Sequence, residues 1–211
     1  MLFFDLDGTL LDSNGIWHEV DRLFLEKRGF PHTAEYHAGV AHATLPQAAK
    51  FTKEFCGIDE PEEDIIAEWI AMASDFYAHE VPLKPFAREF LELCRQHGQE
   101  MAVLTSAASE HCHSALKLHR LEEFFSHVIC VQDLGLTKRQ PETFRLAAER
   151  TGHAVADCVI FDDSLQACCG AREAGMRVVG VYDRFFDEDS AQLQGICHRF
   201  IHGFGEFFEE K

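Results

Sequence analysis

The chain alternates short apolar runs with segments in which apolar residues recur every three or four positions. Short apolar runs are typical of buried strands, and the longer period is typical of helices that pack on a sheet. The alternation therefore predicts a parallel β-sheet covered by helices. Five runs are expected to form its strands: Leu2–Asp5, Met101–Thr105, Val128–Val131, Val159–Phe161 and Val178–Val181.

Proline, serine and glycine mark the ends of the helices between these strands. Proline fits the first helical turn, serine caps it, and glycine adopts the left-handed backbone that ends a helix. We expect three helices bounded in this way, over residues 85–98, 141–152 and 164–175.

The strand pattern is missing between Ser13 and about Pro82, where only helical patterns occur. Residues 16–29 and 44–57 each carry an apolar stripe and end at a glycine. Pro61 is followed by three acidic residues, which are favoured at the positive end of a helix dipole. This stretch is therefore predicted to be an insertion made of helices.

The predicted fold class is α/β, with a Rossmann-like three-layer α/β/α core that contains a parallel sheet. We expect residues 1–13 and 83–211 to form this catalytic core and residues 14–82 to form a helical cap inserted after the first strand. Three large aromatic residues are expected to pack inside the cap: Trp17, Phe51 and Trp69.

Composition narrows the possible partners. The 211 residues are 46% hydrophobic, which is enough for a sizeable core, and the formal net charge is −17 with no cluster of Lys or Arg. An acidic surface repels nucleic acid and anionic membranes, so we expect neither as a partner. No apolar run approaches the roughly 20 residues that span a bilayer, and no signal peptide is visible. We expect a cytoplasmic protein that is a monomer or a weak homodimer.

The eight cysteines do not resemble a disulfide framework. They stand singly in apolar stretches, as Cys94, Cys130 and Cys158 do, or as the adjacent pair Cys168–Cys169, which is typical of buried thiols in a reducing compartment. The segment 111–113, His-Cys-His, could be mistaken for a metal site. Residues two apart point to different sides of a helix, so we favour a packed or solvated helix.

Polar residues follow four of the predicted strands. Because the carboxyl ends of parallel strands meet in one crevice, we expect their side chains to lie together. Carboxylates at this density call for a divalent cation, and all-oxygen ligands favour Mg²⁺ over zinc. A lysine and a hydroxyl beside the cation suit a phosphoryl group. In chain order these residues are Asp5 and Asp7, Thr105 and Ser106, Lys138, and Asp162 and Asp163.

Each of these segments has a second explanation when taken alone. The first acidic pair fits a solvated turn, the Thr-Ser pair and the second acidic pair fit helix caps, and the lysine fits an exposed loop. None of these explains why such groups follow four successive strands in this order. We therefore favour one shared site.

Four motifs carry a resemblance to a known family. They are Asp5-Leu6-Asp7-Gly8-Thr9-Leu10-Leu11-Asp12-Ser13, Ala102-Val103-Leu104-Thr105-Ser106, Lys138-Arg139-Gln140-Pro141-Glu142-Thr143-Phe144, and Val159-Ile160-Phe161-Asp162-Asp163-Ser164 continuing to Ala174-Gly175-Met176. With them the chain resembles the haloacid dehalogenase superfamily of phosphohydrolases along nearly its whole length. The branch it resembles most contains phosphoglycolate phosphatases and β-phosphoglucomutases.

The resemblance implies an Mg²⁺-dependent phosphatase that hydrolyses a small phosphorylated metabolite. Asp5 would be the nucleophile that forms an aspartyl-phosphate, and Asp7 the general acid and then the general base. The cation would be held by the Asp5 carboxylate, the Asp7 carbonyl and Asp163, with Asp162 beside it directly or through water.

The resemblance also implies how the phosphoryl group is bound. Thr105 and the Ser106 amide would contact its oxygens, and Lys138 would offset their charge. Gly8 would allow the sharp turn that brings backbone amides near the phosphate.

Several positions depart from the family pattern. Arg139 stands where relatives often have proline, and Trp17 stands where many have a cap histidine, which here is shifted to His18. His42 occupies the place of a phosphate-binding arginine of β-phosphoglucomutases, and imidazole is a poor substitute for a guanidinium. This favours hydrolysis, with a phosphosugar mutase as the alternative. A signalling receiver domain and a non-catalytic binding protein are two further alternatives, which the helical insertion and the full set of catalytic residue types disfavour.

Overall fold

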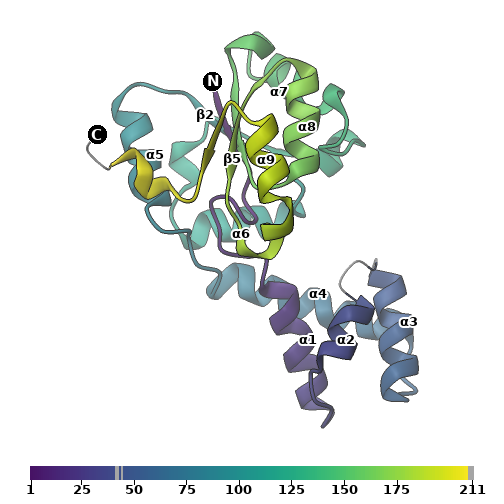
Figure 1. Ribbon diagram of the computed structural model, residues 1–211. Helices are drawn as coiled ribbons and strands as arrows, with labels where there is room; N and C mark the ends of the chain where they lie inside the picture. Colours follow the sequence, from purple (N-terminus) through teal and green to yellow (C-terminus); the bar gives the residue numbers. More distant parts are fainter. Residues whose placement is uncertain (41–42, 44, 209–211) are drawn as a thin grey trace. The chain divides into compact units, whose positions relative to one another are not determined.

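A computed structural model describes residues 1–40, 43 and 45–208 of the chain (Figure 1). The chain divides into two compact units. The core unit consists of Met1–Asn14 and the chain from Val81 onward, and the cap unit consists of Gly15–Glu80. His42, which bears on the choice between hydrolase and mutase, lies outside the described residues.

The core unit contains a six-stranded parallel sheet in the order β3-β2-β1-β4-β5-β6, which confirms the predicted α/β class. Strand β1 is central, because Phe3 is paired with Ala102 on one side and with Ile160 on the other. The strands are β1 (Leu2–Phe4), β2 (Met101–Thr105), β3 (His127–Cys130), β4 (Val159–Asp162), β5 (Arg177–Val181) and β6 (Arg199–Ile201).

Helices cover both faces of the sheet, as the three-layer prediction requires (Figure 1). Parallel crossovers are right-handed. Helices whose crossovers run toward the β3 edge of the sheet therefore lie on one face, and helices whose crossovers run toward the β6 edge lie on the other. Phe3 packs with one of these helix sets, and Phe4 meets the ring of Phe90 in the other set edge-on. The set that packs with Phe3 is α7 (Pro141–Arg150), α8 (Leu165–Ala174) and α9 (Ser190–Ile196), and the set that contains Phe90 is α5 (Ala87–Gln96) and α6 (Ser109–Leu118).

Most of the predicted helix ends in the core are confirmed, but α5 begins at Ala87 and not at Pro85, because Phe86 has a left-handed backbone with a φ of +62°. Pro141 lies in the first turn of α7. The Ser164 hydroxyl accepts the backbone N–H of Ala167 at 3.4 Å and caps α8, and Gly175 ends α8 with a φ of +94°. These signals act locally, so the sequence alone carries them.

Within the described residues, every regular element of the cap unit is a helix, as predicted. Trp69 is buried and meets the ring of Phe24 edge-on at 5.4 Å, and Phe51 packs between other aromatic rings. The expectation for Trp17 is wrong: it is 40% exposed, because the buried stripe of its helix runs through Ile16 and Val20. The cap helices are α1 (Ile16–Lys27), α2 (Ala34–Val40), α3 (Leu45–Cys56) and α4 (Glu62–His79).

Several short elements were not predicted. Strand β6 and helices α2 and α9 were not among the expected elements. In addition, β3 ends at Cys130, because Val131 begins a 3₁₀ turn. The 3₁₀ segments are η1 (Glu122–Phe124), η2 (Val131–Leu134), η3 (Val155–Asp157), η4 (Arg184–Asp189) and η5 (Phe204–Phe207).

All eight cysteines are free thiols, which confirms that they form no disulfide framework. Most are buried or half-buried, but Cys169 is exposed, since it points away from the face of α8 that buries Cys168. In the segment 111–113, Cys112 is buried in α6 and His113 is exposed, as expected for an ordinary helix. Within the described residues, no helix is both long and apolar enough to cross a membrane.

Candidate functional site

Three buried carboxylates meet at the carboxyl ends of β1 and β4. Side-chain oxygens of Asp5, Asp162 and Asp163 all lie within 4.8 Å of one another. The paired strands place them there, because the backbone N–H of Asp5 donates to the carbonyl of Phe161 at 3.0 Å. Asp5, Asp162 and Asp163 are only 6%, 1% and 4% exposed. The mutual repulsion of their carboxylates is therefore poorly screened by water.

Lys138 partly neutralises this cluster from the loop before α7. Its Nζ donates to Asp5 Oδ1 and, at 2.9 Å, to Asp162 Oδ2. Burial alone would lower the pKa of Lys138, but Asp162 and Asp5 raise it above its usual range. The lysine is therefore charged, and three carboxylates against one ammonium leave two negative charges uncompensated when all are ionised.

The pKa values of two of these carboxyl groups reflect their burial and the excess of negative charge. Burial raises the pKa of Asp5 to about 7, against the opposing effect of Lys138, and Asp162 and Asp7 raise it further. Burial likewise raises the pKa of Asp163 well above its usual range, with Asp162 and Asp5 as added causes. A divalent cation would supply the missing charge, and the donor set consists entirely of oxygens. The residues present thus fit a divalent metal ion.

Asp163 is held by residues of the loop after β1. Thr9 Oγ1 donates to its Oδ1 at 3.3 Å, and Asn14 Nδ2 donates to its Oδ2 at 3.0 Å. Gly8 has a φ of +76°, and a Cβ there would lie 2.1 Å from Asp163 Oδ2. Sequence reasoning missed Thr9 and Asn14, whose only local sign was their closeness to Asp7 in the chain.

The two remaining acids have different surroundings. Asp7 is half-buried and accepts a hydrogen bond from Ser13 Oγ at 2.6 Å. Asp162 Oδ1 accepts the backbone N–H of Ser164 at 2.9 Å, and its other oxygen faces Lys138. Since the hydroxyl of Ser164 caps α8, the acidic pair at 162–163 is not needed for that task.

Thr105 is the last residue of β2, and Ser106 follows it. Thr105 is fully buried and its Oγ1 accepts the backbone N–H of Ala107 at 3.1 Å, whereas Ser106 is exposed. Helix α6 begins at Ser109 after Ala108 and has no side-chain cap. The alternative that the Thr-Ser pair caps this helix is therefore wrong.

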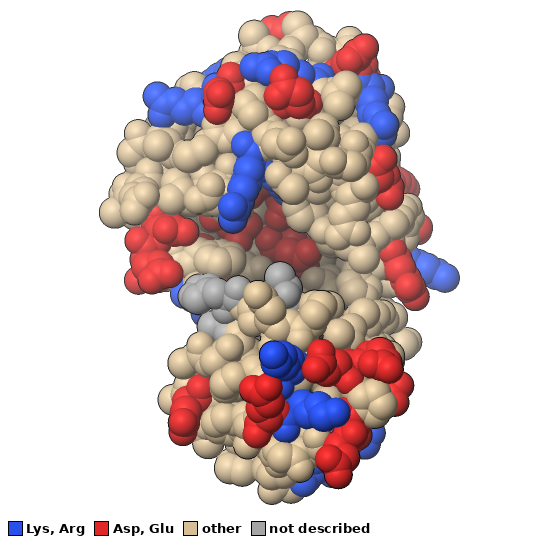
Figure 2. All heavy atoms as spheres, turned by 90° about the vertical axis from the view of Figure 1, so that its right-hand side faces the viewer, with Lys and Arg blue, Asp and Glu red and all other residues tan. Residues whose placement is uncertain are grey.

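A cavity of about 320 Å³ in the core unit brings most of the predicted residues together. Of the predicted set, only Gly8 and Thr105 are not in its wall. Figure 2 shows acidic atoms set back below the surface of this unit, and Lys and Arg side chains scattered among acidic ones on the outside. The wall is formed by Asp5, Asp7, Asn14, Ser106, Thr137, Lys138, Arg139, Asp162, Asp163, Ser164, Gln166, Ala167 and Phe186.

Comparison with known families places this arrangement among hydrolases. A model of the haloacid dehalogenase-like hydrolases matches residues 2–181. That range contains every predicted site residue, from Asp5 to Asp163.

Individual proteins with similar sequences or folds are known from several bacteria. A phosphorylated carbohydrates phosphatase of Thermotoga maritima is 24% identical over 85% of this chain and 84% of its own length. A phosphoglycolate phosphatase of Pseudomonas putida is 29% identical over 92% of this chain and 75% of its own. The crystal structure of a predicted phosphoglycolate phosphatase from Haemophilus somnus has a TM-score of 0.81 at 19% identity, covering 99% of this chain and 96% of that one.

Proposed function

The chain belongs to the haloacid dehalogenase-like hydrolases, and from this premise we propose that it is an Mg²⁺-dependent phosphatase acting on a small phosphorylated metabolite. The observation that carries the proposal is the cavity in which two acids of one loop, Asp5 and Asp7, face a lysine and a second acidic pair. Phosphatase names among the curated relatives support the same reaction class.

In the first step, an oxygen of Asp5 attacks the phosphorus atom, and the ester P–O bond breaks. Asp7 protonates the departing oxygen, so the alcohol leaves in neutral form and the phosphoryl group stays on Asp5. The short hydrogen bond from Ser13 Oγ fixes the orientation of the Asp7 carboxyl group.

In the second step, Asp7 takes a proton from water, whose oxygen attacks phosphorus and displaces the Asp5 carboxylate. Inorganic phosphate is released and both acids return to their starting state. The two carboxylates thus divide one reaction between them, which accounts for acids at positions 5 and 7 on either side of one leucine.

The residues that would hold Mg²⁺ are Asp5, Asp163 and the backbone carbonyl of Asp7. Bound there, the ion supplies positive charge that offsets the phosphoryl oxygens. Asp162 engages Lys138 and a backbone N–H, so its role is to orient the lysine and to lie beside the ion directly or through water.

Phosphoryl oxygens would be bound by Lys138, Thr105 and the backbone N–H of Ser106. The Gly8 N–H already donates to the Leu11 carbonyl at 2.9 Å, so the contribution of Gly8 is the turn itself. A charged lysine that touches the nucleophile also favours the ionised form of Asp5, which the attack requires.

A phosphosugar mutase is the alternative within the family. A mutase must bind a second phosphate, and the position that relatives use for this in the cap is His42 here. If hydrolysis is the reaction, free phosphate should appear in step with the alcohol product, and added glucose 6-phosphate should not divert it. Rapid interconversion of β-glucose 1-phosphate and glucose 6-phosphate with little phosphate released would identify a mutase instead.

The deciding experiment is a screen of the purified protein against a panel of phosphorylated metabolites, with and without Mg²⁺. We expect phosphate release that requires the ion and that Asp5→Asn abolishes, because an amide is nearly isosteric with the carboxylate but cannot attack phosphorus. Retained turnover in a folded Asp5→Asn protein would remove Asp5 from the role of nucleophile.

A further inference from the structure

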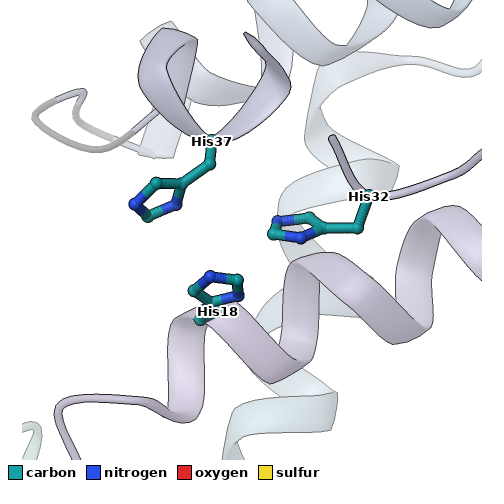
Figure 3. Close-up of side chains that lie close together, drawn as sticks. All are labelled: His18, His32 and His37. Carbon is teal, nitrogen blue, oxygen red and sulfur yellow. The ribbon is translucent and has the colours of Figure 1, made fainter. Parts of the chain in front are cut away.

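Three histidines converge within the cap unit, and none of them has a role in the reaction proposed above (Figure 3). His18 comes from α1, His32 from the segment after α1, and His37 from α2, and their rings turn toward one another. The ring centroid of His18 lies 4.4 Å from that of His32 and 4.7 Å from that of His37. One ring nitrogen of each lies within 4.8 Å of the others.

The inner edge of this cluster lacks a hydrogen-bond partner. Nε2 of His32 is buried, and no donor or acceptor among the described residues satisfies it. A buried polar nitrogen left in this way costs about 1–3 kcal/mol unless something binds it. An orphaned nitrogen that faces two further imidazoles is the arrangement a metal ion would complete.

Packing of the rings alone is the competing explanation. His18 and His37 are nearly parallel, with an angle of 23° between their planes, and stacked rings need no ion. Stacking, however, does not satisfy Nε2 of His32. It also does not explain why three separate segments each contribute a histidine at one point.

We propose that His18, His32 and His37 form a binding site for a divalent transition-metal ion in the cap unit, with Zn²⁺ as the ion that fits the donors best. Three imidazoles suit Zn²⁺ and its first-row neighbours and are poor ligands for Mg²⁺. Tetrahedral ligands at about 2.0–2.1 Å from zinc lie roughly 3.3 Å apart. The rings therefore close in by side-chain rotation when the ion binds.

The surroundings suit such a site. Burial lowers the pKa of His18 and of His32, and the neighbouring histidines of the cluster lower both further. The neighbouring carboxylate of Glu19 is engaged by Arg22 Nε at 2.7 Å. Three protein ligands leave a fourth position for water, and the ion would tie α1 to α2 across the Gly29 turn.

The test is a calorimetric titration of metal-stripped protein with Zn²⁺, carried out in a large excess of Mg²⁺. The excess Mg²⁺ fills the carboxylate site of the core unit, so the remaining Zn²⁺ binding reports on nitrogen ligands. We expect one Zn²⁺ per chain. Co²⁺ at the same site should give the intense visible absorption of a four-coordinate ion, which is a readout independent of enzymatic activity.

Single variants then assign the ligands. His18→Gln, His32→Gln and His37→Gln should each weaken Zn²⁺ binding by at least about 10–100-fold and remove the Co²⁺ spectrum. The matched control is His79→Gln, an exposed histidine of α4 in the same unit, which should change neither. Absence of a tight site in the wild type, or His32→Gln protein that binds Zn²⁺ as the wild type does, would overturn the proposal. Circular dichroism of each variant shows that the loss is not one of folding.

Discussion

The carboxylate of Asp163 is held in place by two donors and by the absence of a side chain at residue 8. Thr9 and Asn14 each satisfy one of its oxygens, and Gly8 leaves the space that these oxygens occupy. Such partners of a carboxylate fix its direction, as the proposed binding of Mg²⁺ would require. The position of this one group therefore depends on residues whose own chemistry takes no part in the reaction.

Gly8→Ala should impair the site more than the fold. The added methyl group would collide with Asp163 and displace it, so affinity for Mg²⁺ should fall by at least about tenfold, with a matching loss of phosphatase activity at limiting Mg²⁺. The positive φ adds a strain of about 1–2 kcal/mol.

The control for this strain is Gly98→Ala, which has a φ of +67° and open space around the new methyl group. It should lose similar stability in urea unfolding and keep its Mg²⁺ affinity. Equal Mg²⁺ affinities in the two variants would contradict the account of Gly8.

Asp7→Asn separates the acid–base role from the nucleophile. Turnover of an alkyl phosphate should fall at least roughly 10²-fold, the usual contribution of general acid–base catalysis. A phospho-enzyme formed from an ester with a good leaving group should persist longer than in the wild type, and rapid-quench measurements with labelled substrate detect it.

The matched control is Asp12→Asn, in the same loop but outside the wall of the cavity. It should keep most of the activity. Normal turnover of an alkyl phosphate by the Asp7 variant would refute the acid–base assignment.

At the scale of elements, a polar link joins three cap helices. Tyr36 of α2 donates to Asp21 of α1 at 3.5 Å, and its hydroxyl also lies 2.8 Å from that of Thr52 in α3. Burial raises the pKa of Asp21 to about 6, against the small opposing effect of the Tyr36 hydrogen bond. The helices thus pack around a carboxyl group that folding prefers to keep protonated.

Asp21→Asn should stabilise the protein at neutral pH but not at acidic pH. Well below the unfolded-state pKa of about 3.9, the aspartic acid is protonated in both the folded and unfolded states, so the variant gains nothing. As pH rises toward 6, ionisation favours the unfolded state, so wild-type stability falls and the variant's advantage grows to about 1–3 kcal/mol at pH 7.

Urea unfolding of both proteins at pH 4 and pH 7 measures this difference. The matched control is Asp59→Asn in an exposed position before α4, which should have little effect at either pH. An advantage of Asp21→Asn that is equal at both pH values would contradict the explanation by burial.

How far the elements could be predicted follows from the range of the interactions that define them. Helices α7 and α8 were predicted because proline, serine and glycine act within one turn of the chain. Strand β6 was missed because it has only three residues and an exposed first position, so no apolar run marks it.

The same reasoning applies to the candidate site. The strand-end carboxylates could be expected to meet, because parallel strands share one carboxyl edge. The donors from Thr9 and Asn14 to Asp163 span about 150 residues of sequence, and no local pattern encodes them. The three cap histidines are likewise brought together only by packing.

At the scale of the whole molecule, the core unit is built from two separated stretches of chain. The backbone N–H of Asp12 donates to the carbonyl of Pro82 at 2.9 Å, and Leu11 and Leu83 form an antiparallel bridge. The chain therefore leaves the core and re-enters it at adjacent points, and every residue of the carboxylate cavity belongs to the core unit.

Replacing residues 15–80 by a short Gly/Ser linker should leave a folded core. We expect cooperative thermal unfolding, and Mg²⁺ at a hundredfold excess over its Kd should stabilise the shortened and full-length proteins alike, by about 2.7 kcal/mol. Differential scanning calorimetry checks both points. A shortened protein that binds a hydrophobic dye and unfolds without a transition would show that the core depends on the cap.

The central place of β1 has a consequence for biosynthesis. Its residues leave the ribosome well before their neighbours in the sheet, Met101–Thr105 and Val159–Asp162, are made. The cap residues in between form a contiguous helical unit with local contacts, which fold fast, whereas pairings distant in sequence form slowly. The nascent chain therefore holds an apolar segment, Leu2–Phe4, without its partner strands while the cap is already complete. Chaperones that shield short apolar segments would act on it in that interval.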